Sequence, residues 1–293
     1  MEFRRVGLNI NYSRGQRYLG GFLGSSEAKD VWLKEMVETW CQAVSTLAQV
    51  AKRYPQTAYS GFVLVLQNEW QYVQRVVPDS AVHFQPLEAV IRGEFIPALF
   101  DCPTADVSAD FRELLGQGVK NAGMAIRNPV DTALRVHRAS RDATSYLVET
   151  LVTGRYFVLD RHKEHVKDAC IAARKDRIAE EKAVLNFRAQ GKPMEKRRNK
   201  RAAEAGIWLT AIPSRLRGTF LSAEAFRDNI RLRYNMVILD MLQLYNGCGT
   251  RMTAAHALLC KVGGLIHIRH DNPADKICHL CDCTLSFGCV EWE

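Results

Sequence analysis

A group of cysteines and a histidine near the end of the sequence has the residue types of a metal site. Cys248, His256 and Cys260 follow the spacing Cys-x7-His-x3-Cys. Thiolates and an imidazole are ligands that tetrahedral zinc prefers, and a closed structural site needs four of them. The position three residues before Cys248, where a Cys-x2-Cys partner would stand, is Tyr245. Zinc is therefore the one cofactor that these residues suggest.

The missing fourth ligand leaves two interpretations open. In the first, His267 or His270 completes the zinc site, and the glycines Gly247 and Gly249 allow a tight knuckle around Cys248. In the second, the knuckle is degenerate, holds no metal, and contributes three ordinary buried side chains.

Motifs for catalysis are missing from the sequence. It has no Asp-Asp pair, no Gly-x4-Gly-Lys-[Ser/Thr], no His-Glu-x2-His and no Gly-x-Ser-x-Gly. His162 and His165 stand at i and i+3, so they share one face of an expected helix. Nothing else marks a site there, and we expect an exposed pair. We therefore expect no enzymatic activity.

Basic residues concentrate at 192–201, and the whole chain carries a net charge of +8. Such a cluster can bind phosphates without regard to sequence, or serve as a nuclear import signal. The alternative is a solvated helix face or linker. Arg227, Arg231 and Arg233 follow and favour phosphate contact. The candidate nucleic-acid-binding residues are Lys192, Lys196, Arg197, Arg198, Lys200, Arg201, Arg215 and Arg217.

Hydrophobic periodicity predicts a mainly α fold with an N-terminal β-hairpin, a helical bundle and a small irregular cysteine- and histidine-containing C-terminal region. In the hairpin we expect a turn at 13–16, and we expect a strand at 207–212. The apolar run 62–66 suggests deep burial. We assign Trp32, Trp40, Trp70 and Trp208 to the core. The expected segments are a hairpin at 1–24, a bundle at 25–155, a charged helix and basic connector at 156–205, a helical segment with the knuckle at 206–271, and an irregular tail at 272–293.

The distribution of apolar residues and cysteines predicts an intracellular location. The longest apolar run has five residues, whereas a membrane span needs about 20. No signal peptide is visible, so we expect the nine cysteines to be reduced thiols or metal ligands. The basic run makes a nuclear location our expectation.

Several stretches, in order along the chain, carry a resemblance to a known family. Gln16-Arg17-Tyr18-Leu19-Gly20-Gly21-Phe22-Leu23-Gly24 resembles the primer-grip hairpin of the reverse transcriptases of non-LTR retrotransposons. The stretch 121–129 is similar to a Gly-Gly-Leu-Gly-Ile-x-Asp-Pro motif downstream of it. Residues 208–234 resemble the segment before the family's Cys-Cys-His-Cys knuckle, and 256–271 resemble the second half of that knuckle and the start of a nuclease.

The resemblance implies a thumb, a basic connector and a degenerate knuckle without the palm and fingers of the parent polymerase. It implies a truncated, non-catalytic, retrotransposon-derived fragment that binds RNA or DNA backbone independently of sequence and has no membrane partner. Two alternatives stay open: a helical protein–protein interaction scaffold, and a decayed element fragment without selected function. RNA or DNA preference and oligomeric state are left open.

Overall fold

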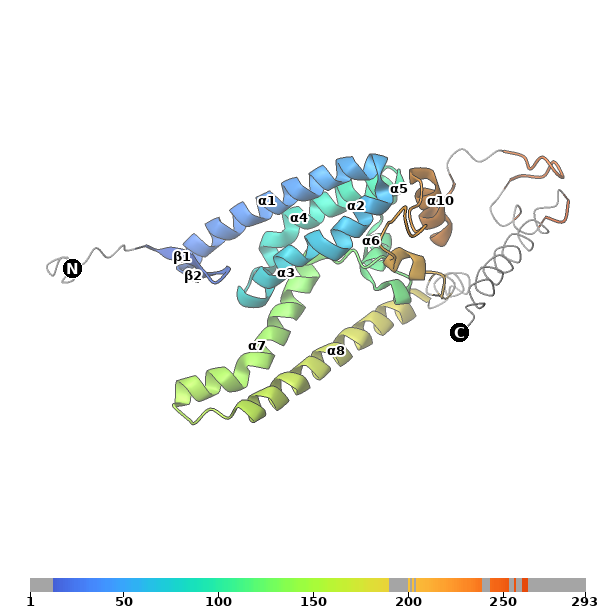
Figure 1. Ribbon diagram of the computed structural model, residues 1–293. Helices are drawn as coiled ribbons and strands as arrows, with labels where there is room; N and C mark the ends of the chain where they lie inside the picture. The colour runs from blue at the N-terminus through green and yellow to red at the C-terminus, as the bar shows by residue number, and fades with distance from the viewer. Residues whose placement is uncertain are drawn as a thin grey trace, which may run out of the picture. The chain divides into compact units, whose positions relative to one another are not determined.

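A computed structural model of the chain describes residues 13–189, 200, 202, 204–238, 243–252, 256 and 260–262. The chain divides into two compact units, Met1–Tyr234 and Asn235–Glu293. The first unit is mainly helical with a two-stranded N-terminal hairpin, and the second holds the cysteine and histidine group, so the expected fold class is confirmed (Figure 1). Among the described residues, no helix is both long and apolar enough to cross a membrane.

The N-terminal hairpin pairs two short antiparallel strands, β1 (Gly15–Tyr18) and β2 (Gly21–Gly24). Leu19 and Gly20 connect them with φ angles of 46° and 80°. Two consecutive positive φ angles are typical of the type I′ turn that suits a two-residue hairpin loop. The turn expected at 13–16 is therefore wrong, because Gln16 lies within β1; residues 1–12 are outside the described part.

Helices make up most of the first unit, and their ends follow ordinary capping rules. The hydroxyl of Ser25 accepts a hydrogen bond from the backbone N–H of Ala28 at 3.3 Å and caps the first helix. The helices are α1 (Ser26–Arg53), α2 (Pro55–Gly61), α3 (Gln67–Val76), α4 (Gln85–Val90), α5 (Ile96–Phe100), α6 (Ala109–Gly116), α7 (Pro129–Thr153), α8 (Leu159–Ala189) and α10 (Ala223–Arg233).

Shorter helical turns join these helices. Phe62–Leu66 and Ile91–Phe95 are π-helical turns that continue α2 into α3 and α4 into α5. Single 3₁₀ turns are found at Ala81–Phe84, Thr104–Asp106, Val119–Asn121 and Ile207–Thr210. The strand expected at 207–212 is wrong, because this stretch forms a 3₁₀ turn in which Leu209 is buried while Ile207 is exposed.

Aromatic side chains form the centre of the bundle. Trp40 of α1 stacks on Phe84 with ring centroids 6.0 Å apart, and Phe62 stacks on Phe95 at 4.5 Å. Trp70 packs against both Trp40 and Phe62 at 6.0 Å. Such pairs add to the stabilisation that burial of their large apolar surface provides.

The core assignments made from sequence hold only in part. Trp40 and Trp70 are buried, whereas Trp32 and Trp208 are half-buried at the edges of the first unit. In the run 62–66 only Phe62 is buried, and Leu64 and Val65 are 52% and 62% exposed. The deep burial expected for the whole run is wrong, because a helical turn places consecutive residues on different faces.

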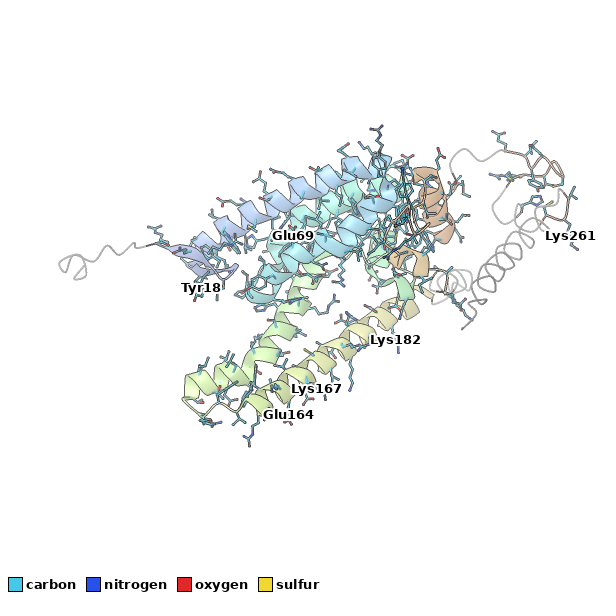
Figure 2. The ribbon with its side chains drawn as sticks, in the orientation of Figure 1. Tyr18, Glu69, Glu164, Lys167, Lys182 and Lys261 are labelled. Carbon is cyan, nitrogen blue, oxygen red and sulfur yellow. The ribbon has the colours of Figure 1, made fainter. Side chains whose placement is uncertain are left out.

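Helices α7 and α8 form a long hairpin that extends from the bundle (Figure 1). Asn128 caps the start of α7, and Gly154 ends it with a φ of 65°. Charged side chains such as Glu164 and Lys167 project from α8 (Figure 2). His162 and His165 are half-buried rather than exposed, because each ring packs near Tyr146 of α7, with ring centroids 6.3 Å apart.

The segment 206–234 packs against the bundle. The buried amide of Gln56 in α2 donates a hydrogen bond to the carbonyl of Thr219 at 2.8 Å and accepts one from the N–H of Leu221 at 2.7 Å. The structural boundary between the two units falls after Tyr234. It therefore differs from the boundary placed at 205/206 from sequence.

Candidate metal and nucleic-acid sites

Three metal-ligating side chains converge in the second unit. The ligand atoms of Cys248, His256 and Cys260 all lie within 4.8 Å of one another. The Sγ atom of Cys248 is 3.0 Å from Nε2 of His256. Residues predicted from their spacing alone are thus brought together as a group that could hold a metal ion.

A tight hairpin places Cys248 in this group. Leu244 and Arg251 form an antiparallel bridge, and the N–H of Tyr245 donates to the carbonyl of Thr250 at 2.8 Å. Gly249 adopts a φ of 69°, which suits a residue without a Cβ. A Cβ on Gly247 would lie 2.7 Å from the carbonyl oxygen of Val262. Both glycines that flank Cys248 therefore fit the tight knuckle expected from sequence.

The second part of the group is held by one backbone hydrogen bond. The N–H of Cys260 donates to the carbonyl of His256 at 2.8 Å, which brings these two ligands close together. Cys260 is buried, and its Sγ lies 3.4 Å from the carbonyl oxygen of Val262. His267 and His270, the candidates for a fourth ligand, lie outside the described residues.

Hydrogen bonds to the sulfur of Cys248 favour its thiolate form. Its pKa is lowered to about 7, first by the hydroxyl of Thr250, then by the backbone N–H of Thr250, with a smaller contribution from His256. The Thr250 hydroxyl lies 3.0 Å from Sγ. Because the thiolate is the form that binds metal, these bonds favour the ligating state.

The basic cluster at 192–201 lies almost wholly outside the described residues. This holds for Lys192, Lys196, Arg197, Arg198 and Arg201, whereas Lys200 is described and exposed. Lys200 forms one long ion pair with Glu204, at 4.0 Å. Arg215 and Arg217 are exposed, and the guanidinium of Arg215 lies 5.1 Å from the ring centroid of Phe220.

The arginines of α10, which favoured phosphate contact in the sequence, serve a structural role. Arg227 donates to the carbonyls of Ala51 and Lys52 at 3.1 and 2.8 Å, where α1 ends. Arg231 is buried and donates to the carbonyl of Phe100 at 2.8 Å, where α5 ends. The last carbonyls of a helix have no partner within it, and these guanidiniums supply one.

Arg233 has the same role toward an irregular segment. Its guanidinium donates to the carbonyls of Val119 and Gly123 at 3.2 and 3.1 Å, and to that of Ala202. The support that these arginines gave to a phosphate-binding surface is therefore withdrawn. The described residues keep Lys200, Arg215 and Arg217 as exposed candidates.

A buried arginine in α6 was missed by the sequence reasoning. Arg112 forms two hydrogen bonds to the carboxylate of Glu88 in α4, at 2.7 and 2.6 Å, and one to the carbonyl of Ile126 at 2.7 Å. A paired and fully hydrogen-bonded charge can be buried without a large penalty. The partners are 24 and 14 residues away, so no local pattern could have revealed them.

Comparison of the chain with protein-family models, with curated proteins and with solved structures gave no match.

Proposed function

We propose that the chain is a non-catalytic, nucleic-acid-binding fragment of a reverse-transcriptase-like protein, whose second unit is stabilised by zinc. The single observation that carries the proposal is the convergence of Cys248, His256 and Cys260 within 4.8 Å. This ligand set occupies the part of the sequence that resembles the knuckle of non-LTR retrotransposon reverse transcriptases. The other stretches of that resemblance support the same family.

Zinc suits the site because its three protein ligands are two thiolates and an imidazole. When bound, zinc would supply folding free energy to the segment that carries its ligands. His267 or His270 would then serve as the fourth ligand, or the fourth position would stay with water.

Phosphate binding is assigned to the basic connector and the loop after it. Lys192, Lys196, Arg197, Arg198, Lys200 and Arg201 provide the charge, and Arg215 and Arg217 extend it. Within the described part, Lys200, Arg215 and Arg217 support this assignment because their side chains are exposed. Binding would be sequence-independent and salt-sensitive, since it releases counterions from the nucleic acid. The same run would direct the protein to the nucleus.

The test is a pair of variants that remove equal amounts of positive charge. One replaces Lys196, Arg197, Arg198, Lys200 and Arg201 by Ala, and the matched control replaces the exposed α8 residues Arg161, Lys163, Lys167, Arg174 and Lys175 by Ala. We expect the first to flatten the slope of log K against log salt by about 0.7–0.9 for each phosphate that the protein no longer neutralises. An unchanged slope, or an equal change in the control, would contradict the assignment.

A specific observation favours the scaffold alternative. Apolar side chains at the tip of the α7–α8 hairpin are strongly exposed: Leu151 by 73%, Val152 by 80%, Tyr156 by 89% and Leu159 by 55%. Grouped apolar residues on a surface mark sites of protein interaction. Weak, salt-independent association with nucleic acid together with a defined protein partner would favour this alternative.

A further inference from the structure

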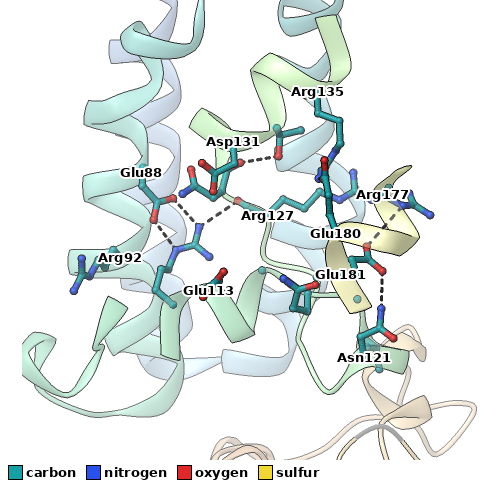
Figure 3. A pocket seen from close by; sticks show the side chains of 18 of the residues that line it. Glu88, Arg92, Glu113, Asn121, Arg127, Asp131, Arg135, Arg177, Glu180 and Glu181 are labelled. Atoms are coloured by element: carbon teal, nitrogen blue, oxygen red, sulfur yellow. Dashed lines mark hydrogen bonds and ion pairs between the residues drawn. The ribbon is translucent and has the colours of Figure 1, made fainter. Parts of the chain in front are cut away.

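A large polar cavity opens between the bundle and the far half of α8. It has a volume of about 1440 Å³ and is lined by residues of α4, α6, α7 and α8 and of the loop between α6 and α7 (Figure 3). Its described lining residues all belong to the first unit, and none of them is part of the cysteine and histidine group or of the portion of the basic connector that the structure describes. It is therefore a separate candidate site.

Cationic side chains outnumber carboxylates around this cavity. Among the described lining residues, seven are basic and five are acidic, which leaves a local excess of two positive charges. The basic residues are Arg92, Arg112, Lys120, Arg127, Arg135, Arg177 and Lys182, and the acidic residues are Glu88, Glu113, Asp131, Glu180 and Glu181.

Three of the arginines that line the cavity form ion pairs with carboxylates. Besides the Arg112–Glu88 pair, Arg135 lies 3.5 Å from Glu180 and Arg177 lies 3.7 Å from Glu181. The Nδ2 atom of Asn121 donates a further hydrogen bond to Glu181 at 2.5 Å. Glu180 and Glu181, the two carboxylates of α8, thus already have partners and do not pair with the other described basic residues of the cavity.

Among the arginines that line the cavity, Arg127 differs from the others: its side chain is exposed and, within the described residues, its guanidinium makes no hydrogen bond or ion pair. Its backbone is held in place: its N–H donates to the Oε1 atom of Gln67 at 3.4 Å, and its carbonyl accepts from Arg112 at 3.3 Å. The side chain lies between the Glu88–Arg112 pair and the charged residues of α8 (Figure 3). The backbone of Arg127 is thus held in place while its guanidinium has hydrogen-bond donors available for an anion.

The charges around Arg127 also favour the binding of an anion. Its pKa is lowered, first by burial and then by the nearby charges of Arg177 and Arg135, with Glu181 acting in the opposite sense. Arg127 is nevertheless exposed to solvent at the cavity, so water screens much of this effect, and the repulsion from the two neighbouring arginines is the part that bears on binding. An anion placed among these three arginines would reduce the repulsion between their charges.

We propose that this cavity binds a phosphate group, with Arg127 as its principal ligand and Lys182 at its edge as a second cation. A planar guanidinium offers paired N–H donors that match phosphate oxygens, which makes arginine well suited to this ligand. The phosphate can belong to the backbone of a nucleic acid strand or to a free polyphosphate. In the first case this inference rests on the proposed function, and in the second it stands without it.

The experiment measures thermal stability and binding with Arg127→Gln and its matched control Arg138→Gln. Arg138 is exposed on α7, the helix that begins two residues after Arg127, and does not line the cavity. The probes are inorganic pyrophosphate, compared with sodium chloride at equal ionic strength, and a labelled 12-residue oligothymidylate. Because Arg127→Gln removes a mutually repelled charge, the variant should melt no lower than wild type without phosphate.

We expect pyrophosphate or the oligonucleotide to bind wild type and Arg138→Gln alike, and Arg127→Gln about tenfold or more weakly. An Arg127-dependent effect with pyrophosphate identifies a free polyphosphate, and one confined to the oligonucleotide identifies a phosphodiester chain. The proposal is overturned if neither probe binds, or if both variants respond equally. Oligonucleotide binding that depends on the connector but not on Arg127 would retain the proposed function and reject this cavity.

Discussion

The ring of Tyr245 lies edge-on to the imidazole of His256, with centroids 5.4 Å apart and an interplanar angle of 75°. Tyr245 thus packs beside the metal-ligating group from the position where a Cys-x2-Cys motif would carry a thiolate. An aromatic ring there orients His256 but offers no thiolate to zinc.

We expect Tyr245→Cys to tighten zinc binding at least tenfold, or by about 1.4 kcal/mol, because it supplies a fourth ligand in the form of a thiolate. Competition with a chromogenic chelator would measure the affinity. Tyr245→Phe is the control, since it keeps the ring and adds no ligand. Equal affinities for the two variants would show that the hairpin does not direct residue 245 to the metal.

Arg231→Ala should lower the free energy of unfolding of the first unit by about 3 kcal/mol. The substitution leaves the carbonyls at the end of α5, Phe100 among them, without their donor in a buried place. Arg217→Ala removes the same charge from an exposed site and should cost less than about 0.5 kcal/mol. Urea denaturation followed by circular dichroism compares them; similar decreases would argue against a structural role for Arg231.

Gly123→Ala should destabilise the first unit by about 2–3 kcal/mol, because the new Cβ would lie 1.9 Å from the carbonyl oxygen of Gln117. Gly118, in the same segment, has a φ of −60° and no atom within 4 Å of a Cβ placed on it. Gly118→Ala should therefore be neutral or stabilising. Thermal melting of the pair checks this, and a stable Gly123→Ala variant would contradict the packing of the segment.

Cys102 should react slowly with iodoacetamide at pH 8. Burial, followed by the charge of Asp106, raises its pKa to about 11, so the neutral thiol dominates at that pH. The rate should increase about tenfold per pH unit as the thiolate forms, and should be higher in urea. This pKa shift also makes folding stability depend on pH. Its contribution to the stability of the folded state is present below pH 9 and is lost as the pH rises from 9 to 11. Peptide mass spectrometry follows the modification; a folded protein that reacts as fast as the unfolded one would contradict the burial.

Helix ends were largely predictable because their signals are local. Ser25 and Ser222 cap α1 and α10, Pro129 begins α7, and Gly154 ends it, and each is a residue type typical of its position. The convergence of Cys248, His256 and Cys260 was also predictable, since a short hairpin places Cys248 and a backbone hydrogen bond joins residues 256 and 260.

Long-range partners were not predictable. Arg227 and Arg231 suggested solvent-facing charges, yet their acceptors lie 129–176 residues earlier at the ends of other helices. The charged residues that surround Arg127 come partly from α8. This helix lines the cavity about 50 residues further along the chain, after the whole of α7. Ile207 and Leu209 suggested a strand, but an alternating apolar pattern of this length does not distinguish a strand from a 3₁₀ turn.

The most direct test of the central claim is the affinity for a labelled single strand, a DNA duplex and an RNA–DNA hybrid across a salt series, with and without zinc. Backbone binding by the basic connector predicts a steep salt dependence and similar affinity for all three, with a gain on adding zinc if the second unit contributes. No binding at low salt, or binding that does not change with salt, would contradict the account.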